Sequence, residues 1–197
     1  MKTYDLALLT KELAESGILF FDLKTLRDIL NIKNEDSFFD VIKRLRRSGV
    51  IKKIERNKYL LKGKLEFNDF ALANFIYSPS YVSFESALNF HGILSQFPLE
   101  ISSATTKNTK KKSVEGRHFF YCQIKKSLFW GYVKKDSYLM AVPEKALIDQ
   151  FYLYTKGLKS FGVDEYDLSL INKRVLKKYL IRIPEIKNKL LKICGFL

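Results

Sequence analysis

The stretch DLKTLRDILNIKNEDSFFDVIKRLRRSGVIKKIERNKYLLK, residues 22–62, decides the fold of the N-terminal part of the chain. Near its middle, Phe38, Ile42 and Leu45 recur at the i, i+4 and i+7 spacing of one helix face. The spacing predicts a helix over residues 35–48 whose apolar face is buried. Its opposite face turns toward solvent, because side chains repeat with the period of the helix.

A second helix and a hairpin are predicted on either side of this helix. Asp22 is a suitable N-cap for a short helix with its own apolar stripe, and residues 31–34 form the turn that follows. Residues 50–61, VIKKIERNKYLL, have the pattern of two short strands joined by a turn at residues 56–58. The stretch therefore predicts two helices, the turn between them and a basic hairpin.

The residues before this stretch supply the remaining elements. Three leucines over residues 4–16 share one helix face, and Gly17 is placed to end that helix. The apolar run at residues 18–21 predicts a short strand that pairs with the hairpin. The whole arrangement is that of a winged helix-turn-helix, in which the second helix of the pair enters the DNA major groove.

Charge is concentrated in the same region. Residues 43–64 contain ten basic residues and a single acidic one, Glu55, and they hold half of the eight arginines of the chain. Arginine is suited to bidentate contacts with guanine or phosphate. We predict DNA contacts at base edges from Ser37, Lys43 and Arg44. We predict contacts with phosphates from Arg47, Lys52, Lys53, Arg56 and Lys58.

A different interpretation of the same residues is a basic surface, on a helical protein-interaction module, that binds no nucleic acid. Asp40 lies on the charged face of the predicted helix and would repel phosphates. In a DNA complex, this carboxylate would read a cytosine amino group or set the register of the helix.

The composition of the whole chain is that of a folded protein with a polyanionic partner. Its 197 residues are 47% hydrophobic and 28% charged, with a net charge of +14. No apolar run approaches the roughly 20 residues that span a bilayer, and charges interrupt the N-terminal residues. We expect a cytoplasmic protein with no membrane contact. Two cysteines and two histidines offer no metal-ligand spacing, so we expect reduced thiols, no metal and no cofactor.

A change of pattern near residues 63–67 predicts two domains, a winged helix-turn-helix at residues 1–64 and a mixed α/β domain at residues 65–197. The predicted fold class is α+β. In the second domain, Ser83 is placed to cap a helix that Gly92 closes, with His91 partly buried against a backbone group.

Later residues of the second domain predict further strands and helices. Alternation at Leu99, Ile101 and Ser103 predicts a strand, strand-like patterns follow at residues 116–126 and 127–133, and residues 138–142 predict an edge strand. Pro143 starts a helix that Gly157 ends, and a basic helical tail from Asn172 is divided by Pro184.

Residues 107–126 form a second basic region, with seven basic residues against one acidic residue. Its densest part is the second basic patch, made of Lys107, Lys110, Lys111 and Lys112. The patch indicates either a further contact with nucleic acid or an acidic partner, or a mobile, solvated loop beside a strand. Aromatic residues alternate with lysines farther along, a pattern that would stack single-stranded bases or fill the core of a sheet.

The run SYVSFESALNFHGILSQFPLEISSATTKNTKK, residues 80–111, resembles the AbiE-type antitoxins of abortive-infection, type IV toxin-antitoxin systems, within the wider group of predicted regulators of viral defence. The matching segments are residues 81–88, His91-Gly92, residues 104–106, Tyr59-Leu60 and VPEKALID at residues 142–149. The order and spacing of these short motifs carry the resemblance over nearly the whole chain.

The resemblance implies a repressor that binds inverted repeats in its own operon. It also implies a C-terminal domain that counteracts a nucleotidyltransferase-like toxin. From the residues themselves we expect no enzymatic activity, and the basic helical tail either caps the second domain or forms a homodimer. Three alternatives stay open: a stand-alone regulator without a toxin, an antitoxin whose winged domain contacts only protein, and a metal-dependent nuclease. The nuclease hypothesis rests on Glu185-Ile186-Lys187 together with Asp164 and Asp167.

Overall fold

The chain divides between Asn68 and Asp69 into an N-terminal unit and a C-terminal unit. The structure is a computed structural model that describes residues 4–63 and 67–195. The boundary predicted between residues 64 and 65 lies outside the described residues. Within those two ranges, eight α-helices and two sheets make the protein α+β, as predicted.

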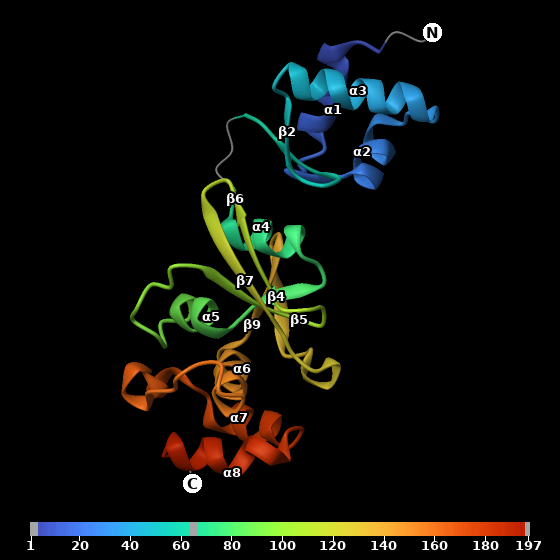
Figure 1. Ribbon diagram of the computed structural model, residues 1–197. Coiled ribbons are helices and arrows are strands. Elements are labelled where there is room, and N and C mark those ends of the chain that lie inside the picture. Colours follow the sequence, from blue (N-terminus) through green and yellow to red (C-terminus); the bar gives the residue numbers. More distant parts are fainter. Residues whose placement is uncertain (1–3, 64–66, 196–197) are drawn as a thin grey trace. The chain divides into compact units, whose positions relative to one another are not determined.

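The N-terminal unit contains three helices and a three-stranded antiparallel sheet of order β1-β3-β2 (Figure 1). Its elements are α1 (Leu6–Glu15), β1 (Phe20–Asp22), α2 (Leu23–Leu30), α3 (Glu35–Arg47), β2 (Ile51–Glu55) and β3 (Lys58–Leu61). The predicted helices and the predicted hairpin are confirmed. The short strand β1 pairs with β3, the inner strand of the sheet.

Local capping explains where the helices of this unit begin and end. The Asp22 carboxylate accepts a hydrogen bond of 2.7 Å from the backbone N–H of Thr25, and this bond lowers the pKa of Asp22. Asn34 caps α3 by accepting from the backbone N–H of Ser37 at 2.9 Å. Gly49 follows α3 at a φ of +76°, a left-handed conformation that glycine adopts without steric cost.

One apolar core holds the N-terminal unit together. The core contains the residues predicted for the apolar faces of the three helices, among them Leu13, Leu26, Phe38 and Leu45. Phe21 of β1 is also fully buried. Because the buried face of α3 is fixed in this way, the cationic residues of the helix lie at the surface.

The C-terminal unit is built on a six-stranded mixed sheet of order β6-β7-β5-β4-β9-β8. The strands are β4 (Ser80–Val82), β5 (Ile101–Thr105), β6 (Lys110–Val114), β7 (Arg117–Gln123), β8 (Tyr132–Lys135) and β9 (Tyr138–Ala141). The pairs β4–β9 and β5–β7 are parallel, and the other neighbours are antiparallel.

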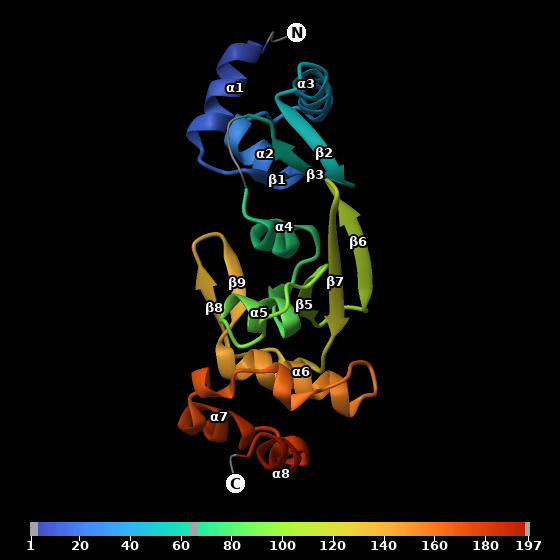
Figure 2. The same cartoon turned by 90° about the vertical axis from the view of Figure 1, so that its left-hand side faces the viewer.

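Helices cover this sheet and one end of it. The α-helices are α4 (Asp69–Ile76), α5 (Phe84–Phe90), α6 (Pro143–Thr155), α7 (Lys173–Leu180) and α8 (Pro184–Ile193), and short 3-10 helices occur at Lys126–Leu128, Val163–Glu165 and Leu168–Leu170. Helix α6 packs against α5 and runs past the ends of the strands, with α7 and α8 on its far side (Figures 1 and 2). In the described part of the chain, none of the helices has the length and apolarity needed to cross a bilayer.

Several predictions for the C-terminal unit need correction. Leu99 is 99% exposed, so the inward alternation predicted from that residue is wrong. The strand starts at Ile101, and its last four residues are all buried, since β5 is an interior strand covered on both faces. Residues 138–142 do not form the edge, because β8 pairs outside β9. Of residues 127–133, only the last two belong to a strand.

The two polar residues that flank α5 behave differently from each other. His91 is partly buried as predicted, with its Nε2 atom 2.9 Å from the backbone oxygen of Ala141, and burial lowers its pKa. Ser83 occupies the N-cap position, but its side chain makes no capping hydrogen bond. Its hydroxyl instead donates to the carboxylate of Asp149 at 2.8 Å.

That carboxylate belongs to a fully buried ion pair on α6. Lys145 and Asp149 lie one helical turn apart, are both completely shielded from solvent, and bond directly to each other. The Tyr81 hydroxyl donates to the same carboxylate at 2.8 Å, and burial raises the pKa of Tyr81 well above its ordinary value. Tyr81 therefore stays protonated as a donor, and β4 is tied to α6 through Asp149.

Removal of the buried negative charge should strongly destabilise the C-terminal unit. In Asp149→Asn, the Lys145 ammonium would stay buried without a counter-charge, and we expect a loss of about 3–5 kcal/mol in the free energy of unfolding. Urea unfolding followed by fluorescence of Trp130, the single tryptophan, measures this loss. The control Lys111→Gln removes an exposed lysine 3.6 Å from Glu100 and should cost less than about 1 kcal/mol. Equal losses in the two variants would contradict the role given to the buried pair.

Candidate nucleic-acid interface

A cationic cleft of about 510 Å³ lies between α3 and the edge strand β2 of the N-terminal unit. It is lined by Lys43, Arg46, Arg47, Gly49, Ile51, Lys52, Lys53 and Lys62. Six of these eight residues carry a positive charge. Such a density of long cationic side chains around one hollow favours a polyanion such as a phosphate backbone.

Three elements bring the cations together. Arg46 and Arg47 end α3, where positive charge also complements the helix dipole. The turn at Gly49 carries the chain directly into β2, which holds Lys52 and Lys53. Lys62 directly follows β3, and its backbone N–H donates to the oxygen of Val50, just before β2, at 2.8 Å. This bond holds Lys62 beside the start of β2, where its side chain lines the cleft.

Asp40, which was predicted to repel phosphates, lies beside one of the predicted contact residues. Its carboxylate lies 3.7 Å from the Nζ atom of Lys43, and both side chains are more than half exposed. A pair this exposed is weak and easily rearranged. Lys43 can therefore exchange the carboxylate for a phosphate, while Asp40 stays at the solvent side of α3.

The cleft contains only part of the predicted contact set. Lys43, Arg47, Lys52 and Lys53 line it, while Ser37, Arg44, Arg56 and Lys58 do not. Two lining residues, Arg46 and Lys62, were not predicted as contacts. Both belong to the basic run at residues 43–64, but only the register of the hairpin against α3 shows that they share a surface with Arg47.

The remaining predicted contacts occupy other positions of the same unit. Arg44 is exposed on α3, two positions from Arg46 and so roughly 200° around the helix from it. Ser37 is partly exposed in the first turn of α3. Arg56 is exposed at the hairpin turn, and Lys58 lies 3.6 Å from Glu55. The cations thus border α3 on both flanks of its exposed face.

Three of the four residues of the second basic patch lie on a strand and not in a loop, and only Lys107 lies in the connection between β5 and β6. Lys110, Lys111 and Lys112 lie on β6, which pairs antiparallel with β7 at the edge of the large sheet. Lys107 donates to the backbone oxygen of Ser78, and Lys112 donates to that of Ile76 at 3.5 Å. Since several of these ammonium groups contact their own unit, the patch is a weaker candidate for binding than the cleft.

Aromatic residues of the neighbouring strand belong to the core. Phe119 and Tyr121 of β7 are fully buried, and the Tyr121 hydroxyl donates to the backbone oxygen of Ala73 at 2.6 Å. Rings held in this way cannot stack on nucleic-acid bases. Phe119 and Tyr121 lie two residues apart and so share one face of β7, which packs into the core.

The acidic residues of the nuclease hypothesis lie in separate elements. Glu185 is in the first turn of α8, Asp164 is in a 3-10 helix, and Asp167 accepts hydrogen bonds from Ser169. Within residues 4–63 and 67–195, no group of three or more His, Cys, Asp or Glu side chains is arranged to hold a metal ion. The two cysteines, Cys122 and Cys194, are buried free thiols, and burial raises the pKa of each.

Comparison with known proteins supplies no functional assignment, so the function is inferred from the residues of the chain. The chain matches no model of a protein family and no curated protein sequence. The cationic cleft is thus the site from which function is inferred.

Arg47 should contribute to binding of any DNA duplex, whatever its sequence. We expect Arg47→Ala to weaken binding and to reduce the slope of log affinity against log salt concentration by about 1, because one fewer phosphate is neutralised. Fluorescence anisotropy over a salt series measures the slope. Lys11→Ala removes an equal charge from α1, outside the cleft, and should leave the slope unchanged. The same reduction in both variants would mean that net charge, and not the cleft, determines binding.

Proposed function

We propose that the N-terminal unit is a winged helix-turn-helix and that the protein is a sequence-specific, DNA-binding transcriptional repressor. The observation that carries this proposal is the cationic cleft between α3 and β2, with six positive side chains in its lining. The order of three helices and a three-stranded sheet ending in a hairpin supports it, because a winged helix-turn-helix has this order.

The proposal assigns different contacts to the two flanks of α3. The helix enters the major groove along its exposed face, with Ser37, Lys43 and Arg44 close to base edges. Arg46, Arg47 and the lysines of β2 bind phosphates on one side of the groove. The hairpin turn at Arg56 serves as the wing and reaches the flanking backbone. Affinity then comes mainly from the cleft, and sequence preference comes mainly from Arg44 and its neighbours.

We further propose that the repressor is the antitoxin of a type IV, AbiE-like system that controls its own operon. This part rests on the resemblance of residues 80–111 and 142–149 to those antitoxins. Residues from both segments, including Tyr81, Ser83 and Asp149, meet in the buried network of the C-terminal unit. Since buried residues cannot contact a toxin, the proposal places the toxin contact elsewhere on that unit. A stand-alone regulator is the alternative.

Binding to the DNA upstream of its own gene should be specific. We expect the full chain to bind this DNA at least about a thousandfold more tightly than a scrambled duplex of equal length. Fluorescence anisotropy across a salt series provides both affinities. If the two affinities were equal and fell steeply with salt, the positive charge would act only as a sequence-independent contact with the backbone, and the repressor proposal would fail.

Arg44→Ala tests whether α3 reads the sequence. We expect a loss of about 1–3 kcal/mol in binding to the upstream DNA, with a much smaller effect on the scrambled duplex. Arg47→Ala is the matched control, since it removes the same charge from the same helix and should weaken both duplexes alike. An Arg44→Ala variant with unchanged specificity would show that another element recognises the bases.

A further inference from the structure

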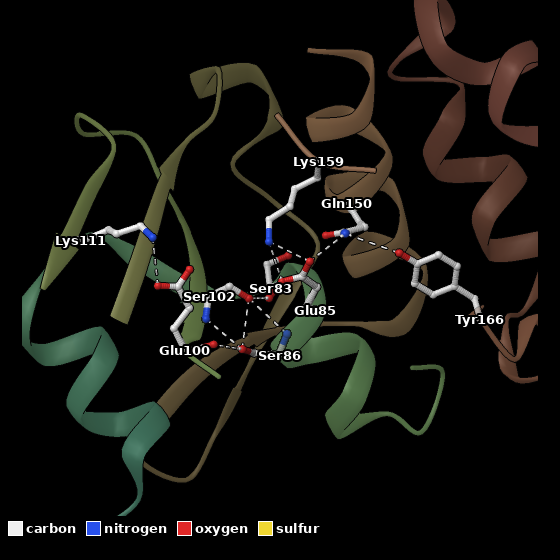
Figure 3. A network of polar contacts seen from close by, with 9 residues as sticks. All are labelled: Ser83, Glu85, Ser86, Glu100, Ser102, Lys111, Gln150, Lys159 and Tyr166. Atoms are coloured by element: carbon white, nitrogen blue, oxygen red, sulfur yellow. Dashed lines mark hydrogen bonds and ion pairs between the residues drawn. The ribbon is translucent and has the colours of Figure 1, made fainter. Parts of the chain in front are cut away.

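The C-terminal unit has a second cleft, of about 220 Å³, whose charge differs from that of the first. Its described lining includes the carboxylates of Glu85 and Glu165 but no lysine or arginine. Figure 3 shows Glu85 bonded to Lys159, whose Nζ atom lies 2.9 and 3.0 Å from the two carboxylate oxygens. Phe97 and Leu99 in the lining are almost fully exposed. Because Lys159 of the same chain already neutralises Glu85, the charges of this cleft select no particular partner for these apolar side chains.

One exposed apolar side chain of the N-terminal unit has charged neighbours that do select a partner. Phe39 is the fifth residue of α3 and is 40% exposed. Its ring meets that of Phe38 edge-on, with the two centroids 5.5 Å apart, and much of it stays open to solvent. An aromatic ring gains free energy when its exposed part is covered.

Phe39 lies in one row with two cations of the cationic cleft. Lys43 and Arg46 follow it by four and seven residues, so the three side chains share one flank of α3. Both cations line the cleft between α3 and β2. The rise of the helix puts Phe39 about 6 Å from Lys43, toward the N-terminus. A ligand that fills the cleft and continues along the helix therefore meets this ring.

The charges of α3 divide along its length. The N-terminal half exposes Glu35, Asp36 and Asp40. The cations begin at Lys43 and continue to the end of the helix. Phosphates are attracted by the second half and repelled by the first. In the proposed DNA complex, the first half, which includes Phe39, thus lies away from the backbone and toward the base edges, as in other helix-turn-helix proteins.

The base edges in the major groove offer one kind of apolar group to this ring. They carry hydrogen-bond acceptors, amino groups and, on thymine alone, a C5-methyl group. A phenyl ring pressed against an acceptor or an amino group leaves that group without a hydrogen-bond partner, which is costly. Contact with the methyl group has no such cost. A phenyl ring at this place therefore favours thymine over the three other bases.

We propose that Phe39 contacts the C5-methyl group of a thymine in the recognition sequence and so selects an A·T base pair at that position. The inference rests on the proposed function, since it needs α3 in the major groove. It adds an apolar specificity contact to the hydrogen bonds assigned to Ser37, Lys43 and Arg44. Burial of one methyl group contributes about fourfold in affinity.

The test removes single methyl groups from the DNA. Each thymine of the DNA upstream of the gene is replaced in turn by deoxyuridine, which pairs with adenine in the same way but lacks the C5-methyl group. Fluorescence anisotropy measures the affinity of the full chain for each duplex. We expect a loss of about fourfold at the position that contacts Phe39.

Variants assign this loss to Phe39. In Phe39→Ala and Phe39→Gln, the same deoxyuridine substitution should change the affinity by less than about 1.5-fold, because the ring that covers the methyl group is absent. Phe39→Leu keeps an apolar side chain and should still lose at least about twofold. Leu8→Ala removes an exposed apolar side chain from α1, outside the cleft lining, and should show the full loss. Circular dichroism verifies the folding of each variant.

Three other results separate the failure of this inference from that of the proposed function. Equal affinities for the upstream DNA and a scrambled duplex would overturn the repressor proposal and the role of Phe39 with it. A preference for the upstream DNA without a loss at any deoxyuridine position would agree with a repressor but overturn the methyl contact. Equal losses in the unaltered chain and in Phe39→Ala would also overturn the contact, because the methyl group would then act through the shape or stiffness of the duplex.

Discussion

The buried ion pair between Lys145 and Asp149 constrains the whole C-terminal unit. Removal of two charges from water is so costly that the pair is stable only when its remaining hydrogen-bonding positions are filled. Tyr81 of β4 and Ser83, the residue that follows this strand, donate to the second oxygen of Asp149, and the Lys145 ammonium lies over the rings of Tyr81 and Trp130. A side chain at position 131 would lie 2.8 Å from the Lys145 side chain, so only glycine fits there. One interaction therefore fixes a helix, a central strand and the loop before β8.

The two units use their charges in different ways. In the C-terminal unit, several lysines contact groups of the same unit, such as Lys112 with the backbone of Ile76 and Lys159 with Glu85. In the N-terminal unit, six cations line one cleft with no carboxylate in its described lining. A high net charge by itself does not distinguish these cases. The clustering of six cations around one hollow, and not the absence of a partner for each of them, makes the N-terminal cleft the stronger site for a polyanion, since Lys43 itself lies beside Asp40.

Sequence patterns correctly predicted the structural features that depend on residues close together in the sequence. They did not predict the features that depend on residues far apart in the sequence. The Asp22 cap, the end of α3 at Gly49 and the start of α6 at Pro143 follow from local chemistry, and the structure has them all. Strand order does not follow, because β5 pairs with β7 and β4 pairs with β9 across long connections. The lining of the cleft could not be predicted in full for the same reason, since Lys62 belongs to it only because the two ends of the hairpin pair. Ser83 does not cap α5, because its side chain is oriented toward Asp149, a residue far away in the sequence, to which its hydroxyl donates.

The opposite character of the two clefts has a consequence for partner choice. In the proposed function, phosphates are attracted by the lysines and arginines beside α3. The cleft lined by Glu85, Gln150 and Glu165 has no lysine or arginine in its described lining, and Glu85 is already paired with Lys159. Charge, and not only shape, thus directs phosphate to the N-terminal cleft.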